Sequence, residues 1–252
     1  ARAHYILGKG LAASADGDDE RAIKHMQIAL DMGFENGDIY EYMAKIYDGR
    51  KEYRKAIDAL TEAIRIEKNN RDHYKNRGAL YDLTGQYEKA EKDYTRNIEL
   101  SRSESGAYLQ RARFYTNRKE FKKALADIDK AIEERTRTPE ELKERVDIYL
   151  ELGKPENALN DLNELIEKDP RDDDSIRKRG DVYALLKEYD KAIIDYSKVI
   201  DSSPGLAFHS YEGRARIYDL KGETEKARMD REEALRIREK PAEKPLFQLK
   251  VK

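Results

Sequence analysis

Apolar residues recur along the chain at the spacing of amphipathic helices. Residues 72–83 carry one apolar stripe at i, i+4 and i+7, and residues 87–100 carry a second stripe of the same kind. Gly85 and its neighbours interrupt the pattern between the two stretches, as a turn does. This order of helix, turn and helix returns along almost the whole chain, and no stretch within it alternates as a strand would. The pattern therefore predicts an all-α protein built from pairs of short helices.

The helix pairs repeat with a fixed period. One alanine, called here the marker alanine, stands in the second helix of every copy at spacings of 34 residues, with a last spacing of 35. The marker alanines are Ala22, Ala56, Ala90, Ala124, Ala158, Ala192 and Ala227. The position twelve residues earlier, called the small-residue column, holds Gly10, Ala44, Gly78, Ala112, Val146, Gly180 and Ala215. The position nine residues before the marker holds Ala13 and then Tyr47, Tyr81, Tyr115, Tyr149, Tyr183 and Tyr218.

Small residues at a fixed period indicate close helix crossings. A side chain larger than a methyl group at such a crossing typically costs about 1–3 kcal/mol, whereas a tyrosine beside it fills space and keeps its hydroxyl near water. A helix of about 13 residues spans only about 20 Å and is marginally stable alone. Each pair must therefore bury its apolar faces on neighbouring pairs, which predicts a one-dimensional stack.

The period, the small residue, the tyrosine and the marker alanine resemble those of the tetratricopeptide repeat (TPR) family, and Pro170 and Pro204 stand near two repeat ends, as in that family. The resemblance implies a right-handed α–α superhelix (a TPR solenoid) of seven helix–turn–helix repeats, with a concave groove lined by the first helices. It also implies that the chain binds proteins. We expect one solenoid domain over residues 1–238, with repeats at about 3–36, 37–70, 71–104, 105–138, 139–172, 173–206 and 208–240.

Residues 239–252 depart from the repeat. Pro241 and Pro245 exclude a continued helix. The last apolar residues alternate with polar ones, as in a strand, and they are Phe247, Leu249 and Val251. We expect a C-terminal tail that is disordered or packs over the last helix pair; the alternative is a strand that docks on a partner.

The composition excludes several classes of protein. The chain has 252 residues, no cysteine, and 50 lysines and arginines against 52 aspartates and glutamates, so its formal net charge is −2. Without cysteine there is no disulfide, zinc–thiolate site or thiol nucleophile, and the near-balanced charge argues against nucleic-acid binding through bulk positive potential. No window approaches the roughly 20 apolar residues of a membrane span. We expect a soluble protein of the cytoplasm or the bacterial periplasm, without direct membrane insertion.

No motif in the sequence predicts catalysis, a metal site or a cofactor. There is no phosphate-binding loop, dinucleotide fingerprint or nucleophile elbow. The histidines show no i, i+4 pair, so we expect isolated surface or packing residues instead of metal ligands. They are His4, His25, His73 and His209. An enzyme, which would need a pocket with converging carboxylates or histidines, is a remote alternative.

Five repeats share one arginine column and one aspartate column. The arginines, one residue before the small-residue column, are Arg77, Arg111, Arg145, Arg179 and Arg214. The aspartates, three residues after the marker alanine, are Asp93, Asp127, Asp161, Asp195 and Asp230. We expect each arginine to be neutralised by an aspartate of its own or an adjacent repeat, with N–O distances under about 4 Å. The alternative is a ladder of free arginines that grips carboxylates or phosphates.

The groove of the resembled fold supplies candidate binding residues. Its lining positions lie 18, 15, 11 and 8 residues before each marker alanine, and over seven repeats they sum to a charge of −5. The candidate partner-binding residues among them are Asp38, Glu41, Lys45, Asp48, Asp72, Lys75, Asp82, Arg113, Thr116, Lys143, Asp147, Arg177, Asp181, Glu212, Arg216 and Asp219. Because opposite potentials steer association, we expect a basic or neutral protein or peptide as partner. The alternative is that these charges only keep a solvent-facing surface soluble.

These observations predict a non-catalytic interaction scaffold that holds a partner segment in an acidic concave groove. The alternative function is a structural or assembly subunit that self-associates through the ends of the stack. Its support is the apolar first helix, where Ile6 and Leu7 have no preceding repeat in this sequence to cover them. Because the sequence begins at Ala1 without an initiator methionine, we expect it to be a processed or trimmed form.

Overall fold

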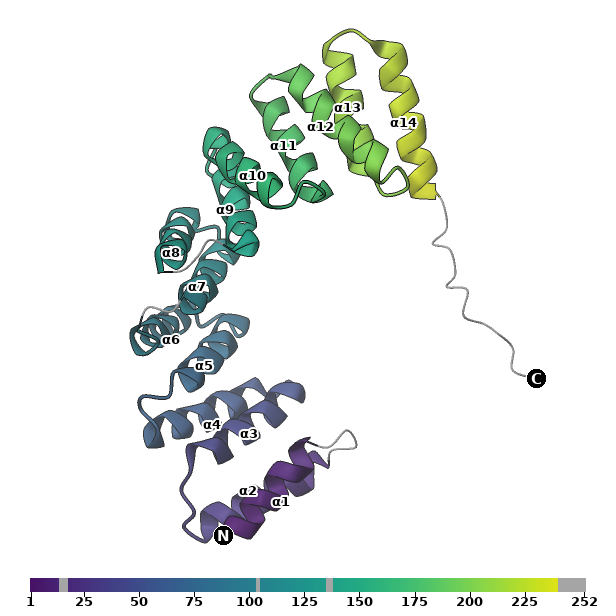
Figure 1. The fold of residues 1–252 in the computed structure, drawn as a ribbon. Coiled ribbons are helices and arrows are strands. Elements are labelled where there is room, and N and C mark those ends of the chain that lie inside the picture. The colour runs from purple at the N-terminus through teal and green to yellow at the C-terminus, as the bar shows by residue number, and fades with distance from the viewer. Residues whose placement is uncertain (14–17, 103–104, 135–137, 240–252) are drawn as a thin grey trace, which may run out of the picture. The chain divides into compact units, whose positions relative to one another are not determined.

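The computed structural model describes residues 1–13, 18–102, 105–134 and 138–239, and the regular structure in these residues is entirely α-helical. The described residues form fourteen helices in seven consecutive pairs (Figure 1). They are α1 (Arg2–Ala13), α2 (Asp19–Asp31), α3 (Gly37–Gly49), α4 (Tyr53–Ile66), α5 (Arg71–Leu83), α6 (Tyr87–Leu100), α7 (Ser105–Asn117), α8 (Phe121–Glu134), α9 (Pro139–Glu151), α10 (Pro155–Lys168), α11 (Asp173–Leu185), α12 (Tyr189–Ser202), α13 (Phe208–Leu220) and α14 (Thr224–Glu239). The predictions for the tail beyond Glu239 lie outside the described residues.

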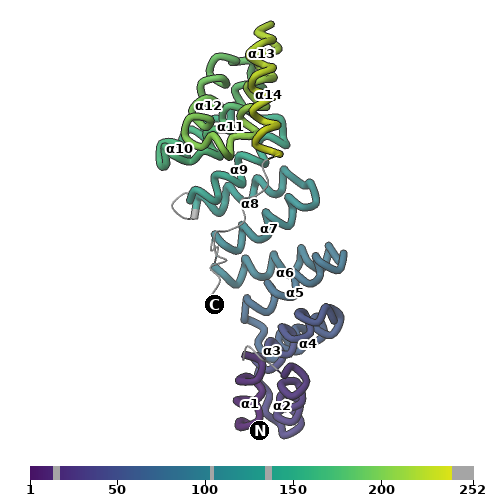
Figure 2. The backbone as a smooth tube through the Cα atoms, turned by 90° about the vertical axis from the view of Figure 1, so that its right-hand side faces the viewer, coloured from purple at the N-terminus to yellow at the C-terminus, as the bar shows by residue number. Residues whose placement is uncertain are grey.

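The helices belong to two compact units, residues 1–136 with α1–α8 and residues 137–252 with α9–α14. Within each repeat the first helix packs along the second, and second helices such as α4 and α12 also pack on the first helix of the next repeat. Figure 2 shows the pairs following one another along each unit. The predicted all-α, TPR-like stack of seven helix pairs is confirmed.

Short polar side chains fix the starts of several first helices. The side chains of Asn36 and Asn70 each accept a hydrogen bond from the backbone N–H group two residues later, at 2.7 and 3.1 Å, and so cap α3 and α5. Thr138 and Glu141 form a capping box at the start of α9. These caps set the register in which each first helix presents its side chains.

The marker alanines lie at the closest helix contacts. All seven side chains are 0% exposed, and the small-residue column is buried from Ala44 to Ala215. At Gly180 an added Cβ would lie 2.9 Å from the Tyr196 ring, so no larger side chain fits while that ring keeps its place. The predicted crossing is confirmed in these six repeats.

The small-residue prediction is wrong for the first repeat. Gly10 is exposed and nothing lies within 4 Å of an added Cβ, whereas at the buried Gly8 an added Cβ would lie 3.0 Å from the Ala22 carbonyl oxygen. This repeat carries Ala13 where the others have the tyrosine, and α1 ends there, two residues earlier relative to its marker than α3 does. No ring wedges beside Gly10, and α1 packs on α2 through Gly8 instead.

The arginine and aspartate columns form ion pairs inside each repeat. Nε and Nη2 of each arginine donate to the two carboxylate oxygens of the aspartate 16 residues later, at 2.7–2.9 Å. The pairs are Arg77–Asp93, Arg111–Asp127, Arg145–Asp161, Arg179–Asp195 and Arg214–Asp230. The aspartates are only 3–6% exposed, and each guanidinium also lies near the tyrosine ring of its own first helix. The structural interpretation is confirmed, with the partner in the same repeat.

The same arginines tie adjacent repeats together. Nη1 of Arg77 donates to Thr61 Oγ1 at 3.1 Å, and Nη1 of Arg214 donates to Ser197 Oγ at 2.8 Å. Both acceptors lie on the second helix of the preceding repeat, and two further arginines reach back in the same way. One guanidinium therefore fixes a helix pair and also its contact with the pair before it.

One backbone position shapes the turn inside the repeats. Six equivalent residues have φ between 60° and 77°, in the left-handed region that favours glycine. They are Lys51, Gly85, Lys119, Gly153, Lys187 and Gly222. The three lysines adopt this conformation because the flanking helices impose it.

Exchanging lysine and glycine at this turn position should shift stability in opposite directions. Lys119→Gly relieves side-chain strain at positive φ and should raise the free energy of unfolding by up to about 1 kcal/mol, whereas Gly85→Lys should lower it by about 1 kcal/mol. Urea denaturation followed by circular dichroism measures both. Shifts of the same sign would contradict a common left-handed turn.

Arg179→Ala should lower the free energy of unfolding by about 3–5 kcal/mol, because it leaves Asp195 buried without its partner. Arg177→Ala is the matched control on α11: its carboxylate partners are about half exposed, so the loss should be only about 0–1 kcal/mol. Chemical denaturation compares the two. Equal losses would mean that the buried pairs do not stabilise the repeats.

Candidate functional site

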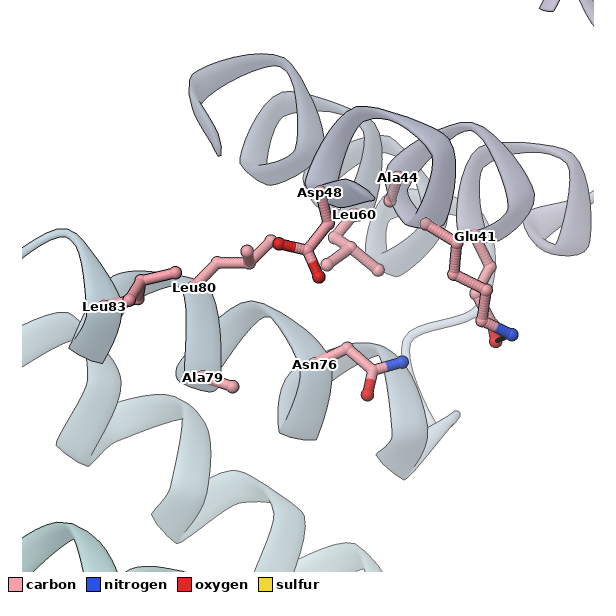
Figure 3. Close-up of a pocket in the computed structure, with 9 residues that line it drawn as sticks. Glu41, Ala44, Asp48, Leu60, Asn76, Ala79, Leu80 and Leu83 are labelled. Atoms are coloured by element: carbon pink, nitrogen blue, oxygen red, sulfur yellow. Dashed lines mark ion pairs between the residues drawn. The ribbon is translucent and has the colours of Figure 1, made fainter. Parts of the chain in front are cut away.

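A pocket opens between the first helices α3 and α5 of the first unit, with a volume of about 240 Å³. We call it the α3–α5 pocket. Three predicted groove residues line it: Glu41, Lys45 and Asp48. The other lining residues are Ala44, Leu60, Asn76, Ala79, Leu80 and Leu83. Figure 3 shows Asp48 pointing from α3 towards α5, so the groove positions of adjacent first helices do converge here.

A second pocket lies between the first helices α11 and α13 of the second unit, with a volume of about 450 Å³. We call it the α11–α13 pocket. The predicted groove residues Arg177, Asp181 and Arg216 line it, and the exposed His209 stands at its edge. The rest of its lining is largely apolar, and comprises Ala184, Leu185, Tyr196, Gly213, Ile217 and Leu220.

In the α3–α5 pocket, Asp48 carries the uncompensated charge. Lys45 Nζ lies 2.7 Å from Glu41 Oε1, and this hydrogen bond is the main cause that raises the pKa of Lys45. Glu41 Oε2 lies 3.5 Å from Nδ1 of His73. Asp48 is exposed and forms no ion pair with any residue that the structure describes. A cationic ligand group would therefore meet Asp48 first.

Behind this pocket, His73 is fully buried between two glutamates. Its Nε2 lies 3.2 Å from Glu67 Oε2, while its Nδ1 faces Glu41 and has no hydrogen-bond partner among the described residues. Hydrogen bonds from Asn70, from His73 and from the backbone of Gly37 lower the pKa of Glu67, against the effect of its partial burial. His73 thus links the second and third repeats and lies directly against the pocket residue Glu41.

Tyr196 forms the floor of the α11–α13 pocket. Its ring is closely flanked by Gly180 and Gly213, where an added Cβ would lie 2.9 and 2.6 Å from ring atoms. Its hydroxyl donates to Asp181 Oδ1 at 2.7 Å, and Arg177 Nη1 donates to the other oxygen of that carboxylate at 2.8 Å. Burial, followed by the charge of Asp181, raises the pKa of Tyr196, so the hydroxyl stays protonated and acts as the donor.

Most other predicted groove residues are paired within the chain. The ion pairs are Lys75–Asp72 at 2.7 Å, Lys143–Asp172 at 2.7 Å, Lys178–Asp147 at 2.7 Å, Arg216–Glu212 at 3.9 Å and Arg231–Asp219. Asp38 accepts a hydrogen bond from the Tyr5 hydroxyl at 3.2 Å, between α1 and α3. These carboxylates are less available to a partner than a count of charges implies.

Three predicted groove residues line neither of the two pockets. Arg113 and Thr116 lie on α7, and Asp82 lies on α5. Burial raises the pKa of the Asp82 carboxyl, and the charge of Arg118 opposes that shift. The structure therefore brings six of the candidate residues to the two pockets and leaves these three outside them.

The groove positions taken from the resembled fold omit the exposed leucines of the two pockets. Leu83, Leu185 and Leu220 each stand seven residues before a marker alanine and are 61%, 65% and 65% exposed. Their recurrence at one repeat position, within otherwise polar surroundings, was the signal in the sequence. The pockets are thus more apolar than the charge pattern indicates.

The expectation of isolated histidines is wrong for one pair. His4 Nδ1 and His25 Nδ1 lie 2.8 Å apart, with stacked rings between α1 and α2. Among the described residues no group of three or more histidine, aspartate or glutamate side chains could hold a metal ion. None of the described helices combines the length and apolar character needed to cross a membrane.

Comparisons with known proteins agree on the fold. Tetratricopeptide repeat models match residues 144–207 and 74–104. The C-terminal part of a TPR protein from Cytophaga hutchinsonii is 18% identical, with a TM-score of 0.78 and 94% of each chain covered. A tetratricopeptide repeat protein from Parabacteroides merdae is 22% identical, with a TM-score of 0.62 and 94% of each chain covered.

A third similar structure is that of YrrB, described as a TPR protein with an unusual peptide-binding site. It is 23% identical, with a TM-score of 0.59, over 72% of this chain and 93% of that one. Among curated proteins, none matches the chain. The 34-residue period, the seven helix pairs, the matching repeat models and these structures lead to one conclusion. The chain belongs to the tetratricopeptide repeat family.

Proposed function

We propose that this protein is a non-catalytic scaffold that binds a basic or neutral protein segment along its first helices. The observation that carries the proposal is the convergence of groove residues from adjacent first helices on the α3–α5 and α11–α13 pockets. TPR proteins generally bind proteins or peptides and are typically non-catalytic. The peptide-binding site described for YrrB adds support by analogy.

The charge of the groove supports a basic or neutral partner. Its lining positions sum to −5 over seven repeats, against −2 for the whole chain. After internal pairing, Asp48 and Asp82 make no ion pair within the described residues, so they are the carboxylates most open to a ligand. A lysine or arginine of the partner would gain charge-assisted hydrogen bonds there.

A second candidate function is self-assembly through the ends of the stack. Ile6 and Leu7 are 60% and 48% exposed on α1, next to each other on one helix. Met229 and Leu235 on α14 are also at least half exposed. Exposed apolar side chains of this size at both outer helices favour contact between copies of the chain.

Charge reversal in the groove should abolish binding of a basic peptide. We expect twelve-residue peptides selected from a random display library to carry net positive charge. The triple variant Glu41→Lys, Asp48→Lys and Asp82→Lys should weaken them about tenfold or more, which is at least about 1.4 kcal/mol. Fluorescence anisotropy measures the affinity.

The control reverses three exposed carboxylates on second helices: Asp58→Lys, Glu88→Lys and Glu99→Lys. It changes the net charge of the chain by the same amount and should leave binding within about twofold. Equal losses in both variants would mean that overall charge, and not the groove, attracts the peptide.

If the groove is the functional surface, the chain should sediment as a monomer across a wide concentration range. Assembly that grows with concentration, and that Ile6→Lys with Leu7→Lys abolishes, would instead favour the second candidate. Analytical ultracentrifugation of the wild type and this variant makes the distinction, because an exposed lysine pair removes the apolar contact without altering buried residues.

A further inference from the structure

The α3–α5 and α11–α13 pockets are built from equivalent repeat positions. Counted from the marker alanine of the later repeat, Leu83 matches Leu220 and Leu80 matches Ile217. The floor is Leu60 in one pocket and Tyr196 in the other, both four residues after the earlier marker. The two pockets are therefore copies of one site, one in each compact unit.

Other interfaces between adjacent first helices close this space. Between α5 and α7, Phe114 stands at the position of Leu80 and is 2% exposed, with its ring centroid 5.4 Å from that of Tyr94. Between α9 and α11, Lys178 reaches across to Asp147 at 2.7 Å. A large ring or a bridging ion pair thus fills the site where the α3–α5 and α11–α13 interfaces leave it open.

The rims of the two pockets differ by an exchange of charge. Eight residues before the earlier marker, the α3–α5 pocket has Asp48 and the α11–α13 pocket has Ala184. Eleven residues before the later marker, the first has Ala79 and the second has Arg216. One pocket therefore presents a carboxylate and the other a guanidinium beside the same apolar floor. We call these two positions the rim pair.

The remaining charges of each pocket are already satisfied. Glu41 compensates Lys45 at 2.7 Å, which leaves Asp48 as the open charge of the α3–α5 pocket. In the α11–α13 pocket, Asp181 is engaged by Arg177 and by the Tyr196 hydroxyl. Arg216 is 73% exposed there, and its nearest carboxylate, Glu212, lies 3.9 Å away. The rim pair thus sets the charge that an incoming ligand meets.

We propose that each pocket binds one leucine-sized apolar side chain of a partner segment, and that the rim pair selects the charge of the residue next to it. The α3–α5 pocket takes an apolar residue beside a lysine or arginine, and the α11–α13 pocket takes one beside an aspartate or glutamate. The exposed leucines supply the apolar contact, and the rim charge supplies the selectivity. This rests on the proposed function, because it assigns the groove two anchoring points with different chemistry.

Methyl NMR of the full chain tests the assignment directly. Two peptides share a glycine–serine background with one central leucine, flanked by lysine in one and by glutamate in the other. The lysine peptide should shift the Leu83 methyl signals, and the glutamate peptide should shift those of Leu220. Each methyl group should titrate with about fivefold preference for its own peptide.

Exchange of the rim pair should reverse the preference. The variant Asp48→Ala with Ala79→Arg gives the α3–α5 pocket the rim of the α11–α13 pocket, so Leu83 should now respond to the glutamate peptide. Ala184→Asp with Arg216→Ala is the reciprocal variant, read at Leu220. Three of these four positions are exposed and the fourth is half-buried, and an unchanged circular dichroism spectrum confirms the fold.

Removal of the anchor contact completes the test. Leu83→Gln should weaken the lysine peptide about fivefold and leave the glutamate peptide at Leu220 unchanged. The inference is overturned if both leucines respond equally to both peptides, or if the rim exchange changes nothing. If neither leucine responds while a display-selected basic peptide still binds and is lost on groove charge reversal, the proposed function stands and this inference falls.

Discussion

The close approach of two helices at a methyl-sized side chain is the constraint on which the rest of the structure depends. The seven marker alanines are fully buried, so the first and second helices of each repeat cross at a fixed point. A fixed crossing determines which side chains of a first helix face the next first helix. The arginine–aspartate fork then restricts rotation in five repeats, because two guanidinium nitrogens must meet one carboxylate at 2.7–2.9 Å. The pockets are a consequence of this geometry.

Features that every repeat must solve in the same way could be predicted from the sequence. The marker alanines and the arginine–aspartate columns recur because the same steric and electrostatic problem recurs. Gly10 has the right size at the right position, yet α1 packs through Gly8, because Ala13 leaves no ring to set the crossing. The pockets could not be predicted in this way, since each depends on what its neighbours leave empty. Leu83 lines an open site because Leu80, unlike Phe114, does not fill it.

A formal charge summed over the groove overstates the charge that a partner meets. Neighbouring groove residues neutralise one another one helical turn apart, as Asp72 does with Lys75 and Arg177 with Asp181. Pairing of this kind depends on side-chain conformations that no column of residues displays. What is left for recognition is a small number of incompletely paired groups next to exposed leucines. Selectivity then depends on single positions more than on the overall field.

The hydrogen bond from an arginine to the preceding repeat gives the stack a direction. In Arg77–Thr61 and Arg214–Ser197 the cation belongs to the later repeat, and the earlier repeat contributes only a hydroxyl. Because domains emerge from the ribosome from the N-terminal side, the unfinished face of the growing chain carries a neutral group that water can satisfy. The cation arrives with its own aspartate 16 residues behind it, inside the same repeat. At these junctions synthesis can proceed repeat by repeat without an ion waiting for its counter-ion.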